Sequence, residues 1–241
     1  IGLGDINGLW GSVSLCDPND DGHIDLLLGN WGLNSILTAS PKQPLILRLN
    51  DFDNNGLTEP ILSIFLRDTL DFFLGRNDIC SAMPSFWPKF NTYKSFAVTP
   101  VQEKLGVDKY TSAKTLKTTE LQSVLMINDG NGSFSKRTLP FVSQSAQIRS
   151  ACCLNHSKGV YLYGGSNSFH YTEGSIDALG LQILHMNPST EELSAFRFSQ
   201  VEYPSSFKRV SFAERILVGD QEMILVAQQE GPLMLIRPKI Q

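Results

Sequence analysis

The sequence contains little cysteine and little charge, and neither follows a functional pattern. Four of its 241 residues are cysteine, and 18% are Asp, Glu, Lys or Arg. The cysteines form no C-x-x-C motif and no zinc spacing, and the adjacent Cys152 and Cys153 are poorly placed to bridge each other. We therefore predict four buried free thiols, namely Cys16, Cys80, Cys152 and Cys153.

Basic blocks, long apolar runs and a leader segment are also missing. The net charge is −4 with no run of Lys or Arg, whereas nucleic-acid binders carry a positive footprint. No apolar run approaches the roughly 18–20 residues that span a bilayer, and no signal peptide is present. We therefore expect no nucleic-acid partner and no membrane span in this chain. Because the chain begins with Ile1, we interpret it as part of a longer protein whose targeting segment lies outside it.

The most informative stretch is DPNDDGHIDLLL, which begins at Asp17. It places oxygen-bearing side chains at positions 1, 3, 5 and 9 of a loop and glycine at position 6, which is the spacing of a calcium-binding loop. Position 7 of such a loop contributes a backbone carbonyl. Repulsion among the clustered acids also favours a cation between them. The predicted ligands are Asp17, Asn19, Asp21, the carbonyl of His23, and Asp25.

A second stretch, DFDNNGLTEPIL, repeats this spacing, with Glu in place of the last Asp. Neither loop has a bidentate Glu at its end, so we predict two structural Ca²⁺ ions with dissociation constants of roughly 10⁻⁵–10⁻³ M. The alternative is an Asp- and Asn-rich β-turn without metal, which the recurrence of the spacing disfavours. The predicted ligands of the second loop are Asp51, Asp53, Asn55, the carbonyl of Leu57, and Glu59.

Short strands and hairpin turns dominate the rest of the chain, and 41% hydrophobic residues suffice for a substantial core. This pattern predicts an all-β fold, a β-propeller of about four blades that forms part of a larger propeller. A β-sandwich is the alternative, but it does not account for a loop that is repeated at the same position relative to its flanking strands. We assign residues 1–241 to one propeller region, with blade-like units at about 9–44, 45–141, 142–201 and 202–241. The predicted strands are 12–16, 26–29, 45–50, 60–66, 121–128, 133–139, 148–154, 160–165, 181–186, 195–201, 207–218, 223–228 and 232–237.

The segment from about 70 to 119 interrupts the strands. Thr99 is a candidate N-cap, Pro100 a first helical residue, Gln102 a capping-box partner and Gly106 a C-terminal stop. We predict a small α-helical insertion between two strands of one sheet. Its aromatic residues are interpreted as the core of the insertion, with an exposed ligand platform as the alternative. They are Phe72, Phe73, Phe86, Trp87, Phe90, Tyr93 and Phe96.

No catalytic motif is evident. The histidines are scattered, and the sequence contains no G-x-S-x-G elbow and no phosphate loop between a strand and a helix. The stretch GGSN at 164–167 is interpreted as a strand-to-loop turn. A long polar loop holds His170, Tyr171, Glu173 and Asp177, which could form part of a ligand site or a catalytic pair. A solvated connection between strands is the simpler interpretation, so we predict no catalytic residues.

These loops and strands resemble the FG-GAP/VCBS repeat family of β-propeller proteins. Its mark is a strand, then D-x-[DN]-x-[DN]-G-x-x-D, then an apolar strand that ends in Gly. Residues 13–29 match throughout, and residues 50–62 match with Glu59 in place of the last Asp. The stretches GNWGLNS, ASPKQP, VLMINDGNGSF and VAQQEGPLMLIR further resemble one lineage of VCBS-repeat proteins from Bacteroidetes-type bacteria, often labelled ASPIC/UnbV-like. LNHSKG and VGDQE replace the Asp loop in the third and fourth units, where we expect no metal.

The resemblance implies a non-catalytic, calcium-stabilised propeller that binds an unidentified protein or glycan. It also implies an extracytoplasmic location, as a secreted or cell-surface protein such as an outer-membrane lipoprotein. The alternative is a propeller-fold enzyme that acts on glycans, a lyase or glycosidase with its site on the blade loops.

Overall fold

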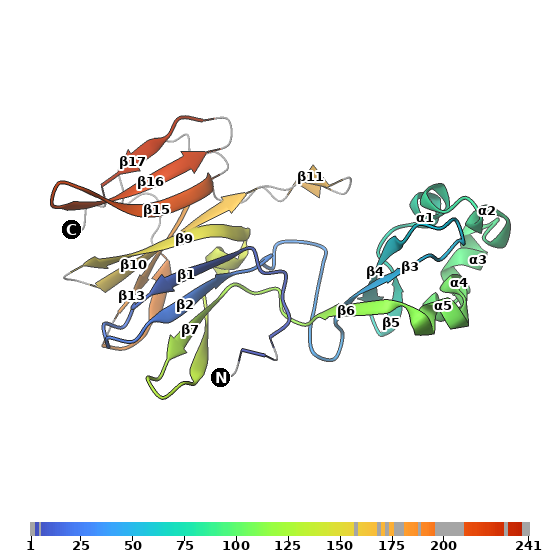
Figure 1. Cartoon of the computed structure of the whole chain (residues 1–241), viewed down its shortest axis with the longest axis horizontal. Helices are drawn as coiled ribbons and strands as arrows, with labels where there is room; N and C mark the ends of the chain where they lie inside the picture. The colour runs from blue at the N-terminus through green and yellow to red at the C-terminus, as the bar shows by residue number, and fades with distance from the viewer. Residues whose placement is uncertain are drawn as a thin grey trace. The chain divides into compact units, whose positions relative to one another are not determined.

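The computed structural model divides the chain into two compact units (Figure 1). Unit 1 comprises Ile1–Ile36 and Leu121–Gln241, and unit 2 comprises Leu37–Glu120. Unit 2 is therefore inserted into the sequence of unit 1. The structure describes residues 3–4, 6–156, 159–167, 170–171, 174–175, 181–187, 189–195, 210–228 and 231–237.

The first sheet of unit 1 is a four-stranded antiparallel meander with strand order β1-β2-β7-β8. Its strands are β1 (Ser12–Cys16), β2 (Asp25–Gly29), β7 (Val124–Asn128) and β8 (Phe134–Thr138). β2 pairs with β7 although the whole of unit 2 lies between them in the sequence. The first four residues of β7 are apolar and buried, as expected for a central strand covered on both faces.

Two further meanders follow in unit 1. The second sheet has the order β14-β13-β10-β9, and the third has the order β15-β16-β17. The short strands β11 and β12 pair with each other in the connection between β10 and β13. The 3-10 helix η1 (Phe141–Gln144) precedes β9 (Gln147–His156), β10 (Gly159–Asn167), β11 (His170–Tyr171), β12 (Gly174–Ser175), β13 (Leu181–Met186), β14 (Leu193–Ala195), β15 (Val210–Val218), β16 (Gln221–Gln228) and β17 (Met234–Ile236).

Serine hydroxyls connect the first strands of the three sheets. Ser14 on β1 donates a hydrogen bond to the carbonyl of Ala151 on β9. Ser150 on β9 donates to the carbonyl of Ala213 on β15 and accepts from its N–H, both at 3.0 Å. Close approach at the end of β2 requires Gly29, because an added Cβ would lie 2.1 Å from the carbonyl oxygen of Ile148. The apolar core between the first two sheets is formed by Cys16, Leu27, Leu125, Ile127, Leu139, Ile148, Ala151, Leu184 and Met186.

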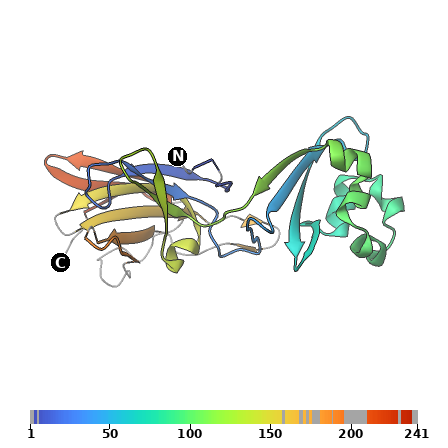
Figure 2. The same cartoon turned by 90° about the horizontal axis from the view of Figure 1, so that it is seen from below.

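Unit 2 consists of a four-stranded antiparallel sheet with helices on one face (Figure 2). The sheet order is β5-β4-β3-β6, with β3 (Leu45–Asn50), β4 (Glu59–Leu66), β5 (Thr69–Phe72) and β6 (Lys114–Thr118). The helices between β5 and β6 are α1 (Arg76–Ala82), α2 (Phe86–Lys89), α3 (Tyr93–Val98), α4 (Val101–Leu105) and α5 (Val107–Ser112). No helix among the described residues is long and apolar enough to cross a membrane.

The core of unit 2 is rich in aromatic side chains. The ring centroids of Phe90 and Phe96 are 5.4 Å apart in an edge-to-face arrangement, and those of Phe72 and Phe96 are 5.9 Å apart. Lys104 is fully buried, with its Nζ paired to the Asp71 carboxylate and 4.2 Å from the Phe96 ring centroid. Phe72, Phe86, Phe90 and Phe96 are thus core residues, as predicted, whereas two other aromatics of the segment stay exposed.

The helical insertion is confirmed, but its capping differs from the prediction. α4 begins at Val101 with Pro100 as its N-cap, and the Thr99 hydroxyl donates to the carbonyl of Ser95 instead (2.7 Å). The capping box lies at α3, between Thr92 and Ser95. Gly106 ends α4 with φ 84°, which is the predicted stop.

The strands are grouped differently from the predicted blade-like units. Strands predicted for units 9–44 and 45–141 combine in one sheet, and the inserted unit runs from 37 to 120 with a sheet of its own. The two remaining strands of the first sheet, β7 and β8, come after the insertion. The mostly β architecture is confirmed, and no described sheet closes on itself. Local patterns could not reveal the pairing of β2 with β7, because its partners are distant in sequence.

Ser150→Ala should lower the free energy of unfolding of unit 1 by about 1–3 kcal/mol, since it leaves two backbone groups of Ala213 without a partner. Ser211→Ala on the exposed side of β15 is the matched control and should stay within about 0.5 kcal/mol. Urea unfolding curves of both variants test this. Equal effects would show that the hydroxyl does not hold β9 against β15.

Candidate metal-binding loops

Both predicted metal loops lie in the turn between two antiparallel strands. The first joins β1 to β2, and the second joins β3 to β4. In each hairpin the last predicted ligand lies opposite the end of the preceding strand: Asp25 opposite Cys16, and Glu59 opposite Asn50. The loops therefore have the same length and the same place in a hairpin, although they belong to different units.

The two loops follow the same backbone path. The fourth residue of each has a positive φ, 58° at Asp20 and 63° at Asn54. The sixth is glycine, with φ 81° at Gly22 and 87° at Gly56. A Cβ at either glycine would meet no other atom, so the dihedral angle rather than lack of space requires glycine.

The first aspartate of each loop holds the chain where it turns back. The Asp17 carboxylate accepts hydrogen bonds from the N–H groups of Asp21 (3.1 Å) and Gly22 (3.0 Å). The Asp51 carboxylate accepts the corresponding bonds in its own loop at the same distances. These bonds orient the carboxylates toward the inside of the turn.

The seventh residues, His23 and Leu57, expose their side chains, which suits residues that would contribute only a carbonyl. Their N–H groups donate to the fifth-position side chains of Asp21 (2.8 Å) and Asn55 (2.7 Å). The His23 ring lies against the turn between β7 and β8, where a Cβ added to Gly130 would be 2.4 Å from His23 Nε2.

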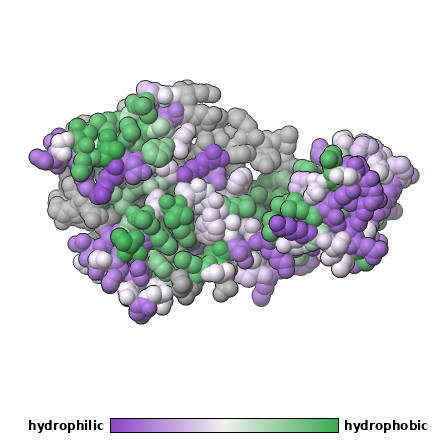
Figure 3. Space-filling model, viewed as in Figure 1, coloured by the Kyte–Doolittle hydropathy of each residue, from purple (hydrophilic) through white to green (hydrophobic). Residues whose placement is uncertain are grey.

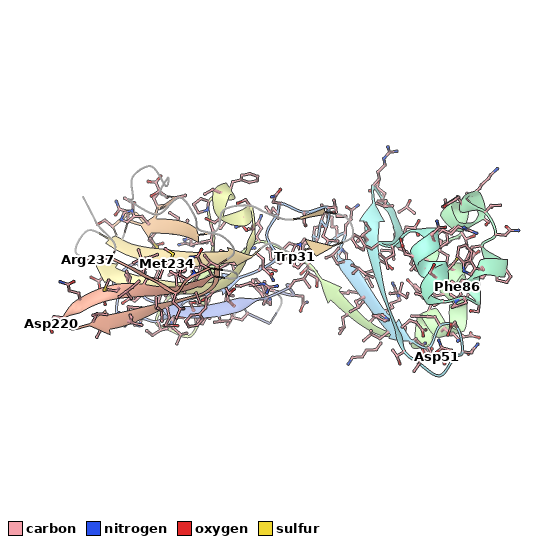
Figure 4. All side chains as sticks on the ribbon, turned by 90° about the horizontal axis from the view of Figure 1, so that it is seen from above. Trp31, Asp51, Phe86, Asp220, Met234 and Arg237 are labelled. Atoms are coloured by element: carbon pink, nitrogen blue, oxygen red, sulfur yellow. The ribbon has the colours of Figure 1, made fainter. Side chains whose placement is uncertain are left out.

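The second loop brings three acidic side chains together. One oxygen from each of Asp51, Asp53 and Glu59 lies within 4.8 Å of the others, so these residues could hold a metal ion. Lys109 Nζ donates to the Asp51 carbonyl (2.5 Å), at the position that Figure 4 labels. The side chain of Phe52 is buried in the core of unit 2, and its N–H donates to Glu59 (2.7 Å). The loop is therefore anchored to both the helices and the core.

The first loop contains two buried oxygens without a donor. Asp25 is fully buried, and its Oδ1 accepts from the N–H of Asn128 (2.6 Å), whereas its Oδ2 has no hydrogen-bond partner. Asn19 Oδ1 is also buried without a partner, while its Nδ2 donates to Asp21 (2.8 Å). Buried acceptors without donors are costly, and a cation in the loop would satisfy both.

The environment of Asp25 disfavours its charge. Burial raises the pKa of this carboxyl from 3.8 to about 6; the Asn128 N–H opposes the shift, and the negative charges of Asp21, Asp17 and Glu191 add to it. A carboxyl destabilised in this way gains from a nearby positive charge.

The loops differ in how far their acids converge. In the part of the chain that the structure describes, only the second loop brings three acidic groups within 4.8 Å of one another. In the first loop, Asn19 is hydrogen-bonded to Asp21, and the acids repel each other across the turn. Of the predicted ligands, the acidic groups of Asp51, Asp53 and Glu59 are thus brought together, whereas those of the first loop are not.

Sequence reasoning missed the supporting residues. Asn128, whose N–H binds Asp25, is more than 100 residues from the first loop. Lys109, which binds the second loop, lies on α5. No spacing in the sequence connects either residue with its loop.

Comparison of the chain with protein-family models, curated proteins and solved structures gives no match. The loop geometry therefore carries the functional argument. The resemblance to FG-GAP/VCBS repeats stays a prediction.

Other predicted features have mixed outcomes. The cysteines are free; Cys153 is half-buried and the other three are buried, and burial raises the pKa of Cys152 to about 12. Residues 164–167 lie in β10 rather than in a turn. His170 belongs to β11, whereas Glu173 and Asp177 of the same polar loop lie outside the described residues. The VGDQE stretch forms the tight β15–β16 turn.

Asp25→Asn should stabilise the metal-stripped protein at pH 7. The raised pKa means that the folded state binds the proton more tightly, so the stability contributed by protonated Asp25 is complete below pH 3.8 and is lost as pH rises to about 6. At pH 7 the cost of charging Asp25 is about 2–3 kcal/mol, and Asn avoids it. Urea unfolding should show a difference from wild type of less than about 1 kcal/mol at pH 4 and a clearly more stable variant at pH 7. A constant difference at both pH values would contradict this.

Proposed function

We propose that this protein is a calcium-stabilised β-propeller module of the FG-GAP/VCBS type, non-catalytic, that binds a ligand outside the cytoplasm. The observation that supports it best is the shared path of two Asp-rich loops, with matching φ angles and matching hydrogen bonds to the first aspartate. If both loops were ordinary turns without metal, we would not expect them to share this backbone path in two different units.

Calcium fits the chemistry of both loops. The side chains predicted as ligands offer only carboxylate and amide oxygens, which suit hard cations. The one imidazole of the two loops, that of His23, lies against the turn between β7 and β8, at Gly130. The carbonyls of His23 and Leu57 add the main-chain oxygen typical of calcium loops. In the first loop the ion would bind Asn19 Oδ1 and Asp25 Oδ2, the two buried oxygens without a partner.

The packing of unit 1 supports a propeller. Three consecutive antiparallel meanders follow one another in the sequence, and β9 contacts both β1 and β15 through serine hydroxyls. Repeated meanders whose first strands are neighbours are what radial blades require.

The outer faces of the first and third sheets favour additional blades. Val13 (62% exposed) and Leu15 (67%) lie on the face of β1 turned away from the second sheet. Phe212 (45%) and Leu235 (47%) lie on the corresponding face of the third sheet, which is hydrophobic in Figure 3. Apolar sheet faces of this kind are normally covered. In our proposal further sheets of a larger propeller cover them.

A propeller-fold enzyme acting on glycans is the second candidate. It would depend on the polar loop with His170 and Tyr171, and on Glu173 and Asp177. Calcium-loaded protein that cleaves a glycan, with activity lost in Glu173→Gln or Asp177→Asn, would favour the enzyme over the binding module.

Calcium should raise the melting temperature, because an ion that binds only the native state stabilises it, by about 2.7 kcal/mol at 100 times the dissociation constant. That corresponds to roughly 5–11 °C for unit 1 and roughly 11–22 °C for the smaller unit 2. Asp21→Ala should remove the response of unit 1, and Asp53→Ala that of unit 2. Asp220→Ala, in the exposed β15–β16 turn, is the matched control and should respond like wild type. Calorimetry with millimolar calcium or with a chelator tests this, and superimposable traces would reject the calcium proposal.

A further inference from the structure

Two aromatic side chains of unit 2 stay exposed although its core is built from aromatic rings. Trp87 on α2 is 39% exposed and Tyr93 on α3 is 66% exposed. The neighbouring Phe86, Phe90 and Phe96 are all buried. Figure 4 labels Phe86 among these helices. Trp87 and Tyr93 therefore contribute large ring surfaces that the core does not use.

A guanidinium group lies between these two rings. The Cζ atom of Arg76 on α1 is 4.7 Å from the ring centroid of Trp87 and 5.2 Å from that of Tyr93. Each distance is within the range of a cation–π interaction. Side chains from three helices thus form one cluster, which we name the Trp–Arg–Tyr cluster: Arg76, Asn77, Trp87 and Tyr93.

Hydrogen bonds fix the geometry of the Trp–Arg–Tyr cluster. Arg76 Nε donates to the carbonyl of Phe90 (2.5 Å), and Arg76 Nη1 donates to Asn77 Oδ1 (3.1 Å). Asn77 Nδ2 donates in turn to Tyr93 Oη (2.9 Å). Side chains ordered before binding lose less conformational entropy when a ligand arrives.

The cluster keeps donors available. Among the described residues, Arg76 Nη2, Trp87 Nε1 and the hydroxyl hydrogen of Tyr93 have no acceptor. The surrounding helices also carry a positive balance: Arg76, Lys89 and Lys94 against Asp78, in a chain of net charge −4. A ligand that suits this site offers acceptors or negative charge beside an apolar ring face.

We propose that the Trp–Arg–Tyr cluster binds an acidic glycan, with a uronic acid residue as the recognised unit. The C–H face of the sugar ring packs on the exposed ring surface of Trp87 or Tyr93, whose π-electrons attract its weakly positive hydrogens. The carboxylate accepts hydrogen bonds from Arg76. This inference deepens the proposed function, because it assigns a ligand class and a site to the binding module.

The surroundings of the cluster favour a glycan over a protein partner. Protein interfaces are enriched in Trp, Tyr and Arg, but they are depleted of Lys, Asp and Ser. On α1–α3 and the turns between them, the exposed residues include Lys89, Lys94, Asp78, Ser81 and Ser85, beside the apolar Ala82, Pro84, Pro88, Ala97 and Val98.

Isothermal titration of the calcium-loaded full chain with short oligogalacturonides tests the proposal, with neutral dextran oligosaccharides as the comparison ligand. We expect oligogalacturonide binding that is at least tenfold tighter than dextran binding. At least one of Trp87→Ala and Tyr93→Ala should weaken it about tenfold, as expected for the loss of an aromatic contact. Arg76→Lys should weaken the acidic ligand selectively, because it keeps the charge but loses the planar fork.

Phe141→Ala is the matched control, since Phe141 is 81% exposed and lies in unit 1. Absence of oligogalacturonide binding, equal binding of dextran, or binding unchanged in Trp87→Ala and Tyr93→Ala would each overturn the proposal. Far-UV circular dichroism shows whether a variant is folded, and a misfolded Trp87→Ala is replaced by Trp87→Phe, which should weaken binding less. The calcium proposal fails separately, through a melting temperature that does not respond to calcium.

Discussion

The pairing of β2 with β7 is the interaction on which unit 1 depends most. It completes the first sheet after the 84-residue insertion of unit 2. A buried polar network lies at one end of the pairing, next to Leu28 and Val124. The N–H of Asn30 donates to Ser123 Oγ (2.9 Å), and the backbone of Ser123 exchanges two hydrogen bonds of 2.8 Å with the Gln144 side chain. The N–H of Gly32 donates to the carbonyl of Leu121 (2.8 Å), where the chain leaves unit 1 and returns. Because every one of these bonds is buried, loss of any partner would be costly.

The same pairing explains the environment of Asp25. β7 ends at Asn128, whose N–H meets the Asp25 carboxylate at the start of β2. The strand pair therefore buries a carboxylate and satisfies only one of its oxygens. This disfavours the charged form of Asp25, a cost that calcium would offset in the proposed function. In the second loop the hydrogen-bond donors come from unit 2 itself. The N–H of Phe52 donates to Glu59, and Lys109 Nζ donates to the Asp51 carbonyl.

The sequence predicted those features of the fold that depend on neighbouring residues. β1, β3 and β13 have the predicted bounds, because alternating or continuous apolar residues between turn signals define a strand. The glycines of both loops were also predicted from local sequence, because a positive φ at the sixth loop position favours glycine. The grouping of strands was not predicted, because it depends on β2 meeting β7 across an insertion. The predicted N-cap at Thr99 was wrong by one residue. The Thr99 hydroxyl donates to the carbonyl of Ser95, and the helix begins at Val101 instead of Pro100.

The second loop has a wider role in unit 2 than its position in a hairpin suggests. Phe52, inside the loop, belongs to the same core cluster as Phe86, Phe90 and Phe96. Asn50, just before the loop, donates to the carbonyl of Lys109 on α5 (2.8 Å), and Lys109 donates back to Asp51. The loop therefore contacts the helical layer through both its main chain and its core side chain. An ion held by Asp51, Asp53 and Glu59 would stabilise the helices that carry the Trp–Arg–Tyr cluster as well as the turn itself. Calcium in the first loop would instead stabilise the sheet packing of unit 1. The two loops share a backbone path, but an ion in each would stabilise a different part of the protein.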